Sequence, residues 1–240
     1  MARLNYFVFK LVLCYNIAKI MKIKDRAAFF DIDETLVKGQ TQKFLALVAF
    51  KEGKIGLFKL LGLLFFFARY KLGLVKNIEE IMEASYAIVK GWPATEADRL
   101  IKKSFEHGIK QKIFPEGERL IKKLKKDGCR IILVSNTLQQ IVDLLVDYLG
   151  AETGIGTTLV EKNGVLEGKI GRLVYGQNKV KYLQESFGRQ IDFKKSSAYT
   201  DNKSDLPLLE LVGRPVVVNP DLTLKAEATK RNWPVMKFKI

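Results

Sequence analysis

The 240-residue sequence has little histidine or cysteine, and this scarcity excludes several kinds of site. Its two cysteines, Cys14 and Cys129, form no CxxC pair, so neither a disulfide framework nor a cysteine-rich zinc site is expected. The single histidine, His107, excludes a His-rich metal site and disfavours a Ser-His-Asp triad. Any chemistry that the chain carries is therefore sought among other side chains.

Acidic residues are also few, with 26 Asp and Glu against 41 Lys and Arg, which leaves a formal charge of +15. Such a charge attracts anionic partners without identifying them. The basic residues are scattered and accompany no RNP-like, zinc-finger or helix-turn-helix pattern, so no nucleic-acid partner is expected. With 48% hydrophobic and 28% charged residues, the composition is that of a globular protein and not of a disordered one.

The chain lacks an uninterrupted apolar run long enough to span a bilayer. Residues 4–20 contain 13 apolar residues among 17, but Lys10 interrupts them and no small-residue cleavage site follows. We expect residues 1–25 to form a basic apolar helix that either lies on an anionic membrane surface or packs on protein. A cytoplasmic location, peripheral at the inner face of the membrane in the first case, follows from this interpretation.

A second apolar run covers residues 60–68 and is bounded by Lys59 and Arg69. Nine uncharged residues are too few for a spanning helix. The run indicates either a buried helix of a small helical domain or an apolar surface that accepts a lipid substrate or rests on a membrane.

Short apolar strands alternate with helical stretches along most of the chain. The expected strands are 27–30, 130–134, 197–200 and 215–218, with a strand-turn-strand unit at 157–170 around Asn163-Gly164. The expected helices include a long helical region at 40–112, a helix opened by Pro115 and ended at Gly128, and helices at 137–149 and 177–187. This alternation predicts an α/β fold, a Rossmann-like parallel sheet with helices on both faces, and a helical insertion after the first strand.

Polar side chains follow several of the predicted strands. They are Asp31, Asp33 and Thr35 after the first, Ser135, Asn136 and Thr137 after the second, and Asp201 and Asp205 after a later one, with Lys179 near the start of a helix. Since sites in such sheets form beyond the carboxyl ends of the strands, four carboxylates, a hydroxyl and an ammonium are expected on one rim.

Four neighbouring carboxylates repel one another and need a cation. Oxygen ligands favour a hard ion such as Mg²⁺, and Mg²⁺ beside a lysine and a hydroxyl forms a pocket for a phosphate dianion. An aspartate can then act as a nucleophile and form an aspartyl-phosphate. The residue set therefore predicts phosphoryl-transfer chemistry.

The segments DIDET, ILVSN, GQNK and TDNKSD resemble motifs one to four of the haloacid dehalogenase (HAD) superfamily, in that family's order. The later segments VNPD and RNWPVMKF resemble the phosphoserine-phosphatase-like branch, subfamily IB. This resemblance implies a catalytic core formed by residues 26–37 and 113–240, with an inserted α-helical, C1-type cap formed by residues 38–112.

Carried over by motif position, the resemblance implies a nucleophile at Asp31 and a general acid at Asp33. It further implies Mg²⁺ binding by Asp31, Asp33 and Asp201, phosphate binding by Ser135, Asn136 and Lys179, and supporting roles for Asp205 and Thr35. Glu34 departs from the small residue often found at its position; its carboxylate either shapes access to the site or points to solvent.

The substrate is less well defined by the resemblance. Family members that act on phosphoserine carry a cap Glu and a cap Arg, and Gln40 and Ser85 stand at or near those places here. Neutral side chains bind a zwitterion less strongly than charged ones, which disfavours phosphoserine. With the apolar cap and the basic N-terminal segment, the partner expected is a phosphorylated small molecule or a lipid phosphate.

The main interpretation is a Mg²⁺-dependent phosphomonoester hydrolase that acts through an aspartyl-phosphate. One alternative is a phosphotransferase or mutase with the same chemistry, and another is a non-catalytic membrane-surface protein that retains the fold. A dehalogenase needs no Mg²⁺, so Asp201 and Asp205 disfavour it. The oligomeric state is left open.

Overall fold

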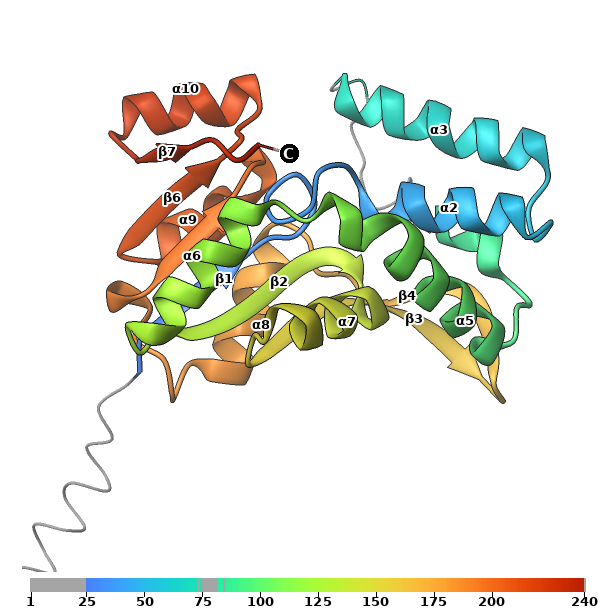
Figure 1. Cartoon of the computed structure of the whole chain (residues 1–240), viewed down its shortest axis with the longest axis horizontal. Coiled ribbons are helices and arrows are strands. Elements are labelled where there is room, and N and C mark those ends of the chain that lie inside the picture. The colour runs from blue at the N-terminus through green and yellow to red at the C-terminus, as the bar shows by residue number, and fades with distance from the viewer. Residues whose placement is uncertain (1–24, 73, 75–81, 84, 240) are drawn as a thin grey trace, which may run out of the picture.

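The computed structural model describes residues 25–72, 74, 82–83 and 85–239, and the N-terminal helix expected at 1–25 falls almost entirely outside them. Within these residues, seven strands form one sheet in the order β4-β3-β2-β1-β5-β6-β7 (Figure 1). The strands are β1 (Ala27–Phe30), β2 (Arg130–Leu138), β3 (Thr153–Lys162), β4 (Val165–Arg172), β5 (Ser197–Thr200), β6 (Arg214–Val218) and β7 (Val235–Met236).

The pairing is parallel at every neighbouring pair of strands except β3 and β4, which form an antiparallel hairpin. Asn163 and Gly164 connect this hairpin with φ angles of 51° and 76°, the left-handed conformations that a tight hairpin turn requires. The predicted α/β class and the predicted strand-turn-strand unit are therefore confirmed.

The described α-helices occupy the stretches between the strands. They are α2 (Thr41–Lys51), α3 (Leu57–Lys71), α5 (Ala94–Ser104), α6 (Pro115–Lys126), α7 (Gln139–Leu149), α8 (Gln177–Phe187), α9 (Leu206–Leu211) and α10 (Leu222–Lys230). Helix α6 begins with Pro115 and is followed by Gly128 at a φ of 76°, as the sequence predicts.

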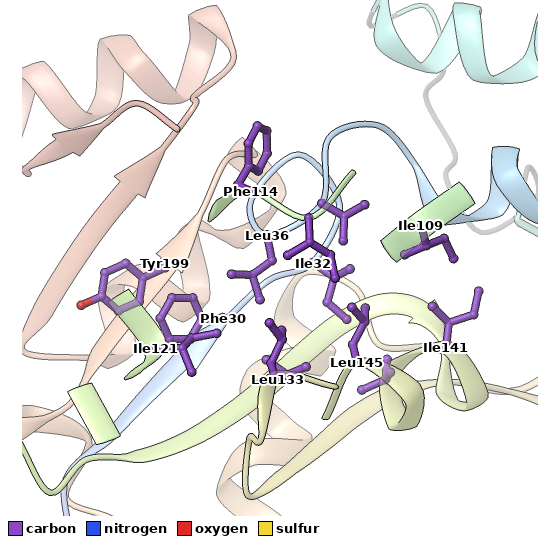
Figure 2. Packing of buried hydrophobic residues seen from close by; sticks show 14 of the residues in the cluster. Phe30, Ile32, Leu36, Ile109, Phe114, Ile121, Leu133, Ile141, Leu145 and Tyr199 are labelled. Atoms are coloured by element: carbon purple, nitrogen blue, oxygen red, sulfur yellow. The ribbon is translucent and has the colours of Figure 1, made fainter. Parts of the chain in front are cut away.

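Both faces of the central strands are buried, and their residues alternate between two apolar clusters. Phe30 and Leu133 belong to the cluster that includes Ile121 of α6 and Ile141 and Leu145 of α7 (Figure 2). The neighbouring residues on the same strands instead belong to a cluster with α8, α9 and α10. This arrangement explains why the strands read as continuous apolar runs.

The second strand is longer than predicted. Residues 135–138 continue β2, and α7 begins at Gln139 and not at Thr137, so the predicted strand end at 134 and helix start at 137 are wrong. The register of β2 against β3 shifts between Val134 and Leu138, and beyond this shift Leu138 pairs with Thr157. The Thr137 hydroxyl lies 3.0 Å from that of Thr41, a tertiary contact that accompanies the extended backbone.

Helices α2, α3 and α5 lie at one end of the molecule and have a small apolar core of their own, with Leu100 completely buried (Figure 1). An isolated bridge between Val37 and Ile113 joins the two chain segments that lead into and out of this helical region. The region also pairs with β4. The Gly91 amide donates to the Leu166 carbonyl at 2.8 Å, and the Leu166 amide donates to the Trp92 carbonyl at 2.9 Å. The helical cap is present as expected, and its exact bounds at 38 and 112 stay a prediction.

The part of the chain that the structure describes contains no helix that is both long and apolar enough to cross a bilayer.

Candidate active site

A tight turn after β1 places two aspartates at the carboxyl end of the sheet. The Ile32 carbonyl accepts hydrogen bonds from the Leu36 and Val37 amides at 2.8 and 2.9 Å, which folds the chain back on itself. Asp31 continues the line of β1, and its amide donates to the Tyr199 carbonyl at 3.0 Å. Backbone hydrogen bonds therefore fix Asp31 and the turn that contains Asp33.

Asp33 is held by the first residue of α2. The Thr41 amide donates to Asp33 Oδ1 at 2.8 Å, and the Thr137 hydroxyl lies 3.5 Å from Asp33 Oδ2. Burial raises the pKa of Asp33 to about 7, and the negative charge of Asp31 adds to the rise although the Thr41 amide opposes it. Asp33 thus occupies a defined position in a poorly solvated place.

Lys179 forms the electrostatic centre of the site. Its Nζ lies 2.8 Å from Asp31 Oδ1 and 2.7 Å from Asp205 Oδ2, and the lysine is only 2% exposed. Burial by itself lowers the pKa of Lys179, but the charges of Asp205 and Asp31 outweigh burial and raise it, so the ammonium stays charged. The Thr200 hydroxyl donates to the same Asp205 oxygen at 2.6 Å.

Asp201 lies beside this group at the end of β5. Its Oδ1 is 3.4 Å from the hydroxyl of the fully buried Thr35. Burial, followed by the negative charge of Asp31, holds the pKa of Asp201 well above its ordinary value. Within the part of the chain that the structure describes, the buried Asp205 Oδ1 has no hydrogen-bond partner. Oxygen donors that repel one another, one of them unpaired, have the ligand chemistry that suits Mg²⁺, so these residues fit the predicted ion.

No group of three or more His, Cys, Asp or Glu side chains able to hold a metal occurs among the described residues. The set predicted for Mg²⁺ uses only two side chains, those of Asp31 and Asp201, together with the Asp33 backbone carbonyl. It therefore stays a prediction that the donor chemistry supports.

The end of β2 supplies the residues predicted to bind phosphate. Ser135 is buried, and its Oγ lies 3.3 Å from the Thr137 hydroxyl. The Asn136 side chain is engaged elsewhere: its Nδ2 is 3.1 Å from Met82 Sδ, and its Oδ1 accepts from Thr157 at 3.3 Å. The side chain of Asn136 therefore ties the core to Met82 of the cap.

One pocket of about 100 Å³ brings nearly all of the predicted site residues together. It is lined by Asp31, Asp33, Glu34, Gln40, Gln42, Met82, Ser85, Tyr86, Ser135, Asn136, Tyr175, Lys179, Asp201, Asn202, Ser204 and Asp205. Thr35 is the one predicted site residue outside this lining, and it contacts the site through Asp201. By contrast, Lys181, two residues after Lys179, is exposed.

Several supporting residues had no role assigned from the sequence. Thr41, which orients Asp33, lies outside the recognised motifs, and Thr200, which orients Asp205, opens TDNKSD without an assigned role. Asn219 follows β6, and its Nδ2 lies 3.4 Å from the Glu34 carbonyl while its Oδ1 accepts from the Phe238 amide at 2.9 Å. The resemblance around VNPD marks Asn219, but only the fold shows which loop it supports.

A family model described as haloacid dehalogenase-like hydrolase matches residues 28–210. Among similar proteins, the inhibition of morphological differentiation protein of Streptomyces azureus is 27% identical over 88% of this chain and 78% of its own length. Phosphoserine phosphatase SerB1 of Mycobacterium tuberculosis is 27% identical over 89% of this chain and 71% of its own length.

Among solved structures, a phospho-aspartyl intermediate analogue of phosphoserine phosphatase superposes with a TM-score of 0.68 at 21% identity. The match covers 90% of this chain and 94% of that one. At this identity, the superposition establishes a common fold.

Proposed function

Because the chain belongs to the haloacid dehalogenase-like hydrolase family and is a phosphatase of that family, we propose that it hydrolyses phosphomonoesters through a phosphorylated Asp31 with the help of Mg²⁺. One observation carries the proposal: buried Lys179 bridges Asp31 and Asp205 at the rim where Asp201 and Ser135 also line the pocket. Phosphoryl transfer requires mainly positioning and charge stabilisation, which this group supplies.

In the first step, an Asp31 carboxylate oxygen attacks phosphorus, and the bond from phosphorus to the leaving oxygen breaks. Asp33 donates a proton to that leaving oxygen. Thr41 and Thr137 hold the Asp33 carboxyl in place for this transfer. The products of the step are an alcohol and an aspartyl-phosphate on Asp31.

In the second step, Asp33 takes a proton from water, and the water oxygen attacks phosphorus. Phosphate leaves and the Asp31 carboxylate is regenerated, so one water is consumed for each ester. Lys179 and the Ser135 hydroxyl bind the non-bridging oxygens in both steps, together with backbone amides after Asp31 and Asn136.

Asp31, Asp201 and the Asp33 carbonyl would hold Mg²⁺, which supplies positive charge against the phosphate oxygens when it is bound. Asp205 then positions Lys179, since its Oδ2 accepts from that ammonium at 2.7 Å.

The proposed substrate is a small or lipid-like phosphomonoester. In the described part of the cap, the side chains lining the pocket are uncharged: Gln40, Gln42, Met82, Ser85 and Tyr86. Such a wall offers no ion pair to the carboxylate of an amino-acid substrate. This lining supports a substrate other than phosphoserine.

Peripheral contact with an anionic membrane is a second candidate function, favoured by the outer face of α3. Leu57, Phe58, Leu61 and Phe65, the α3 stripe, are 53%, 90%, 51% and 62% exposed. Residues 53–78 include five Lys or Arg and no Asp or Glu. An apolar stripe in a segment whose charged residues are all basic is complementary to an anionic bilayer. Residues 1–24 are likewise basic without acids, so their charge disfavours them as the cover of this stripe.

The test of the catalytic proposal is Mg²⁺-dependent phosphate release from an aryl phosphate and a panel of alkyl phosphomonoesters, with and without chelator. We expect turnover that a chelator abolishes and excess Mg²⁺ restores. Acid-quenched enzyme should contain a phosphorylated peptide that includes Asp31. A competing alcohol that captures most of the phosphoryl group would instead show a phosphotransferase. Turnover that is equal with and without chelator would contradict the metal assignment.

A further inference from the structure

Glu34 occupies a strained position at the wall of the pocket. Its φ of 57° lies in the left-handed region, which is uncommon for residues other than glycine and asparagine. The conformation is held because the Glu34 amide donates to the Val37 carbonyl at 2.7 Å and the Glu34 carbonyl lies 3.4 Å from Asn219 Nδ2. The fold therefore keeps a large acidic residue where glycine would meet no steric cost.

The strain is not offset by a structural contact of the side chain. Glu34 is one of the residues that line the pocket, and its carboxylate forms neither an ion pair nor a hydrogen bond with any residue that the structure describes. Strained residues without a packing role are most often found at functional sites. The carboxylate is therefore free to contact a ligand.

The charges around the pocket indicate which ligand would suit this carboxylate. Five carboxylates line it, and among the described residues Lys179 is the one cationic side chain in the lining. Lys179 is already committed to Asp31 and Asp205. Even with a divalent cation bound, the excess of negative charge attracts a positively charged leaving group and repels an anionic one.

A second hydrogen-bond acceptor lies in the lining of the same pocket. The Gln40 Oε1 is buried and has no hydrogen-bond partner among the described residues. An unpaired buried acceptor costs stability until a ligand donates to it. An ammonium carries three N–H donors, so it can satisfy a carboxylate and an amide oxygen together.

We infer that Glu34 is a specificity-determining residue that binds an ammonium group on the leaving alcohol of the phosphomonoester. The inference rests on the proposed function, which accounts for binding of the phosphate group of the substrate. It assigns an amino-alcohol phosphate without a carboxylate as the substrate class. Phosphoethanolamine and phosphoserine separate the two requirements, because they differ only by one carboxylate.

The first experiment measures binding and does not depend on turnover. Calorimetry with Mg²⁺ present compares 2-aminoethylphosphonate with propylphosphonate, in which a methyl group replaces the ammonium, and with 3-phosphonopropionate, in which a carboxylate does. We expect the cationic probe to bind about 10- to 100-fold more tightly than the neutral one, the value of one charge-assisted hydrogen bond. The anionic probe should bind most weakly.

Two variants test whether Glu34 causes this order. Glu34→Gln removes the charge at nearly constant size, and Glu34→Asn removes it with a residue that tolerates the left-handed backbone. In both variants the preference for the cationic probe over the neutral one should fall below about threefold, because the charge-assisted hydrogen bond is lost. Glu185→Gln removes an exposed carboxylate of α8 outside the pocket and should keep the wild-type preference. Melting temperatures check that each variant is folded.

The second experiment measures kcat and KM for phosphoethanolamine, 2-hydroxyethyl phosphate and phosphoserine. The wild type should favour phosphoethanolamine through KM, and the Glu34 variants should lose that advantage. Hydrolysis without any preference for the ammonium, or a preference that survives both variants, overturns the inference and leaves the proposed function standing. Charge-ordered binding that depends on Glu34, without hydrolysis of any ester, overturns the proposed function instead.

Discussion

The proposed catalytic rim and the outer face of the cap place charged and apolar side chains in opposite environments. At the rim, Lys179 and Asp205 are 2% and 1% exposed, whereas on the cap Phe58 is 90% exposed. Neither placement contributes to folding by burial of apolar area, because an ionic group is costly to bury and an exposed phenylalanine is not buried. Both regions therefore retain features that stability alone does not favour, and such features indicate function.

The largest expected effect on turnover at the rim is that of replacing Asp31, the proposed nucleophile. Asp31→Asn keeps the size of the side chain but removes the carboxylate proposed to attack phosphorus, so turnover should fall by at least about 10³-fold. Phosphate release at saturating Mg²⁺ measures the loss. The Asp31→Asn protein should still unfold cooperatively, and turnover within tenfold of wild type would rule out Asp31 as the nucleophile.

Removing the buried ammonium should have the largest effect on stability. Lys179→Met leaves the Asp31 and Asp205 carboxylates facing each other without a counter-ion, at a cost of about 3–5 kcal/mol in the free energy of unfolding. Urea denaturation measures this difference. Lys181→Met, on the exposed side of the same helix, is the matched control and should change stability by less than about 0.5 kcal/mol. Equal effects of the two substitutions would contradict the buried ion-pair description.

The interior of the cap should respond like an ordinary apolar core. Leu100 is completely buried among α2, α3 and α5, so Leu100→Ala should reduce stability by about 2–5 kcal/mol through lost burial and a cavity. Thermal or urea unfolding provides the measurement. A change below about 1 kcal/mol would show that this cluster contributes little.

The outer face of the cap should show the smallest change in stability and a selective change in binding. Phe58→Ser with Phe65→Ser should alter the free energy of unfolding by no more than about 0.5 kcal/mol per site, because both side chains are exposed. Co-sedimentation with vesicles that contain anionic lipid should decrease, since the α3 stripe loses apolar area. Identical sedimentation of variant and wild type would exclude the stripe as the membrane contact, and Leu222→Ser, an exposed leucine of α10, serves as the control.

Much of the fold could be predicted because the apolar patterns and the residues at helix ends and turns indicated the same elements. The helix at 177–187 and the strand at 197–200 were found where expected, and the hairpin turn at Asn163-Gly164 followed from residues that adopt left-handed backbone. The continuation of β2 through residues 135–138 could not be predicted. Its pairing with β3 and the contact between Thr137 and Thr41 join segments distant in the sequence.

Local sequence patterns likewise did not predict the pairing of the cap with β4. Gly91-Trp92-Pro93 indicates a helix break, and the structure shows that this break is hydrogen-bonded to Leu166 of the hairpin. The orientation of Asp33 by Thr41 was not predicted either, since a threonine at the start of a helix does not indicate that its amide binds an aspartate eight residues earlier.

The sequence by itself determined the alternation of strands and helices and the carboxylates that follow the strands, because periodicity and strand-end position are local properties of the chain. It left the role of Glu34 undecided between shaping access to the site and pointing to solvent. Only the tertiary structure placed Glu34 in the pocket wall, showed its left-handed backbone and a side chain without a partner among the described residues, and buried Lys179 between Asp31 and Asp205. The physical reason is that burial and charge pairing depend on residues from separate segments, such as Lys179 and Asp31, which are 148 positions apart, and no local pattern records them.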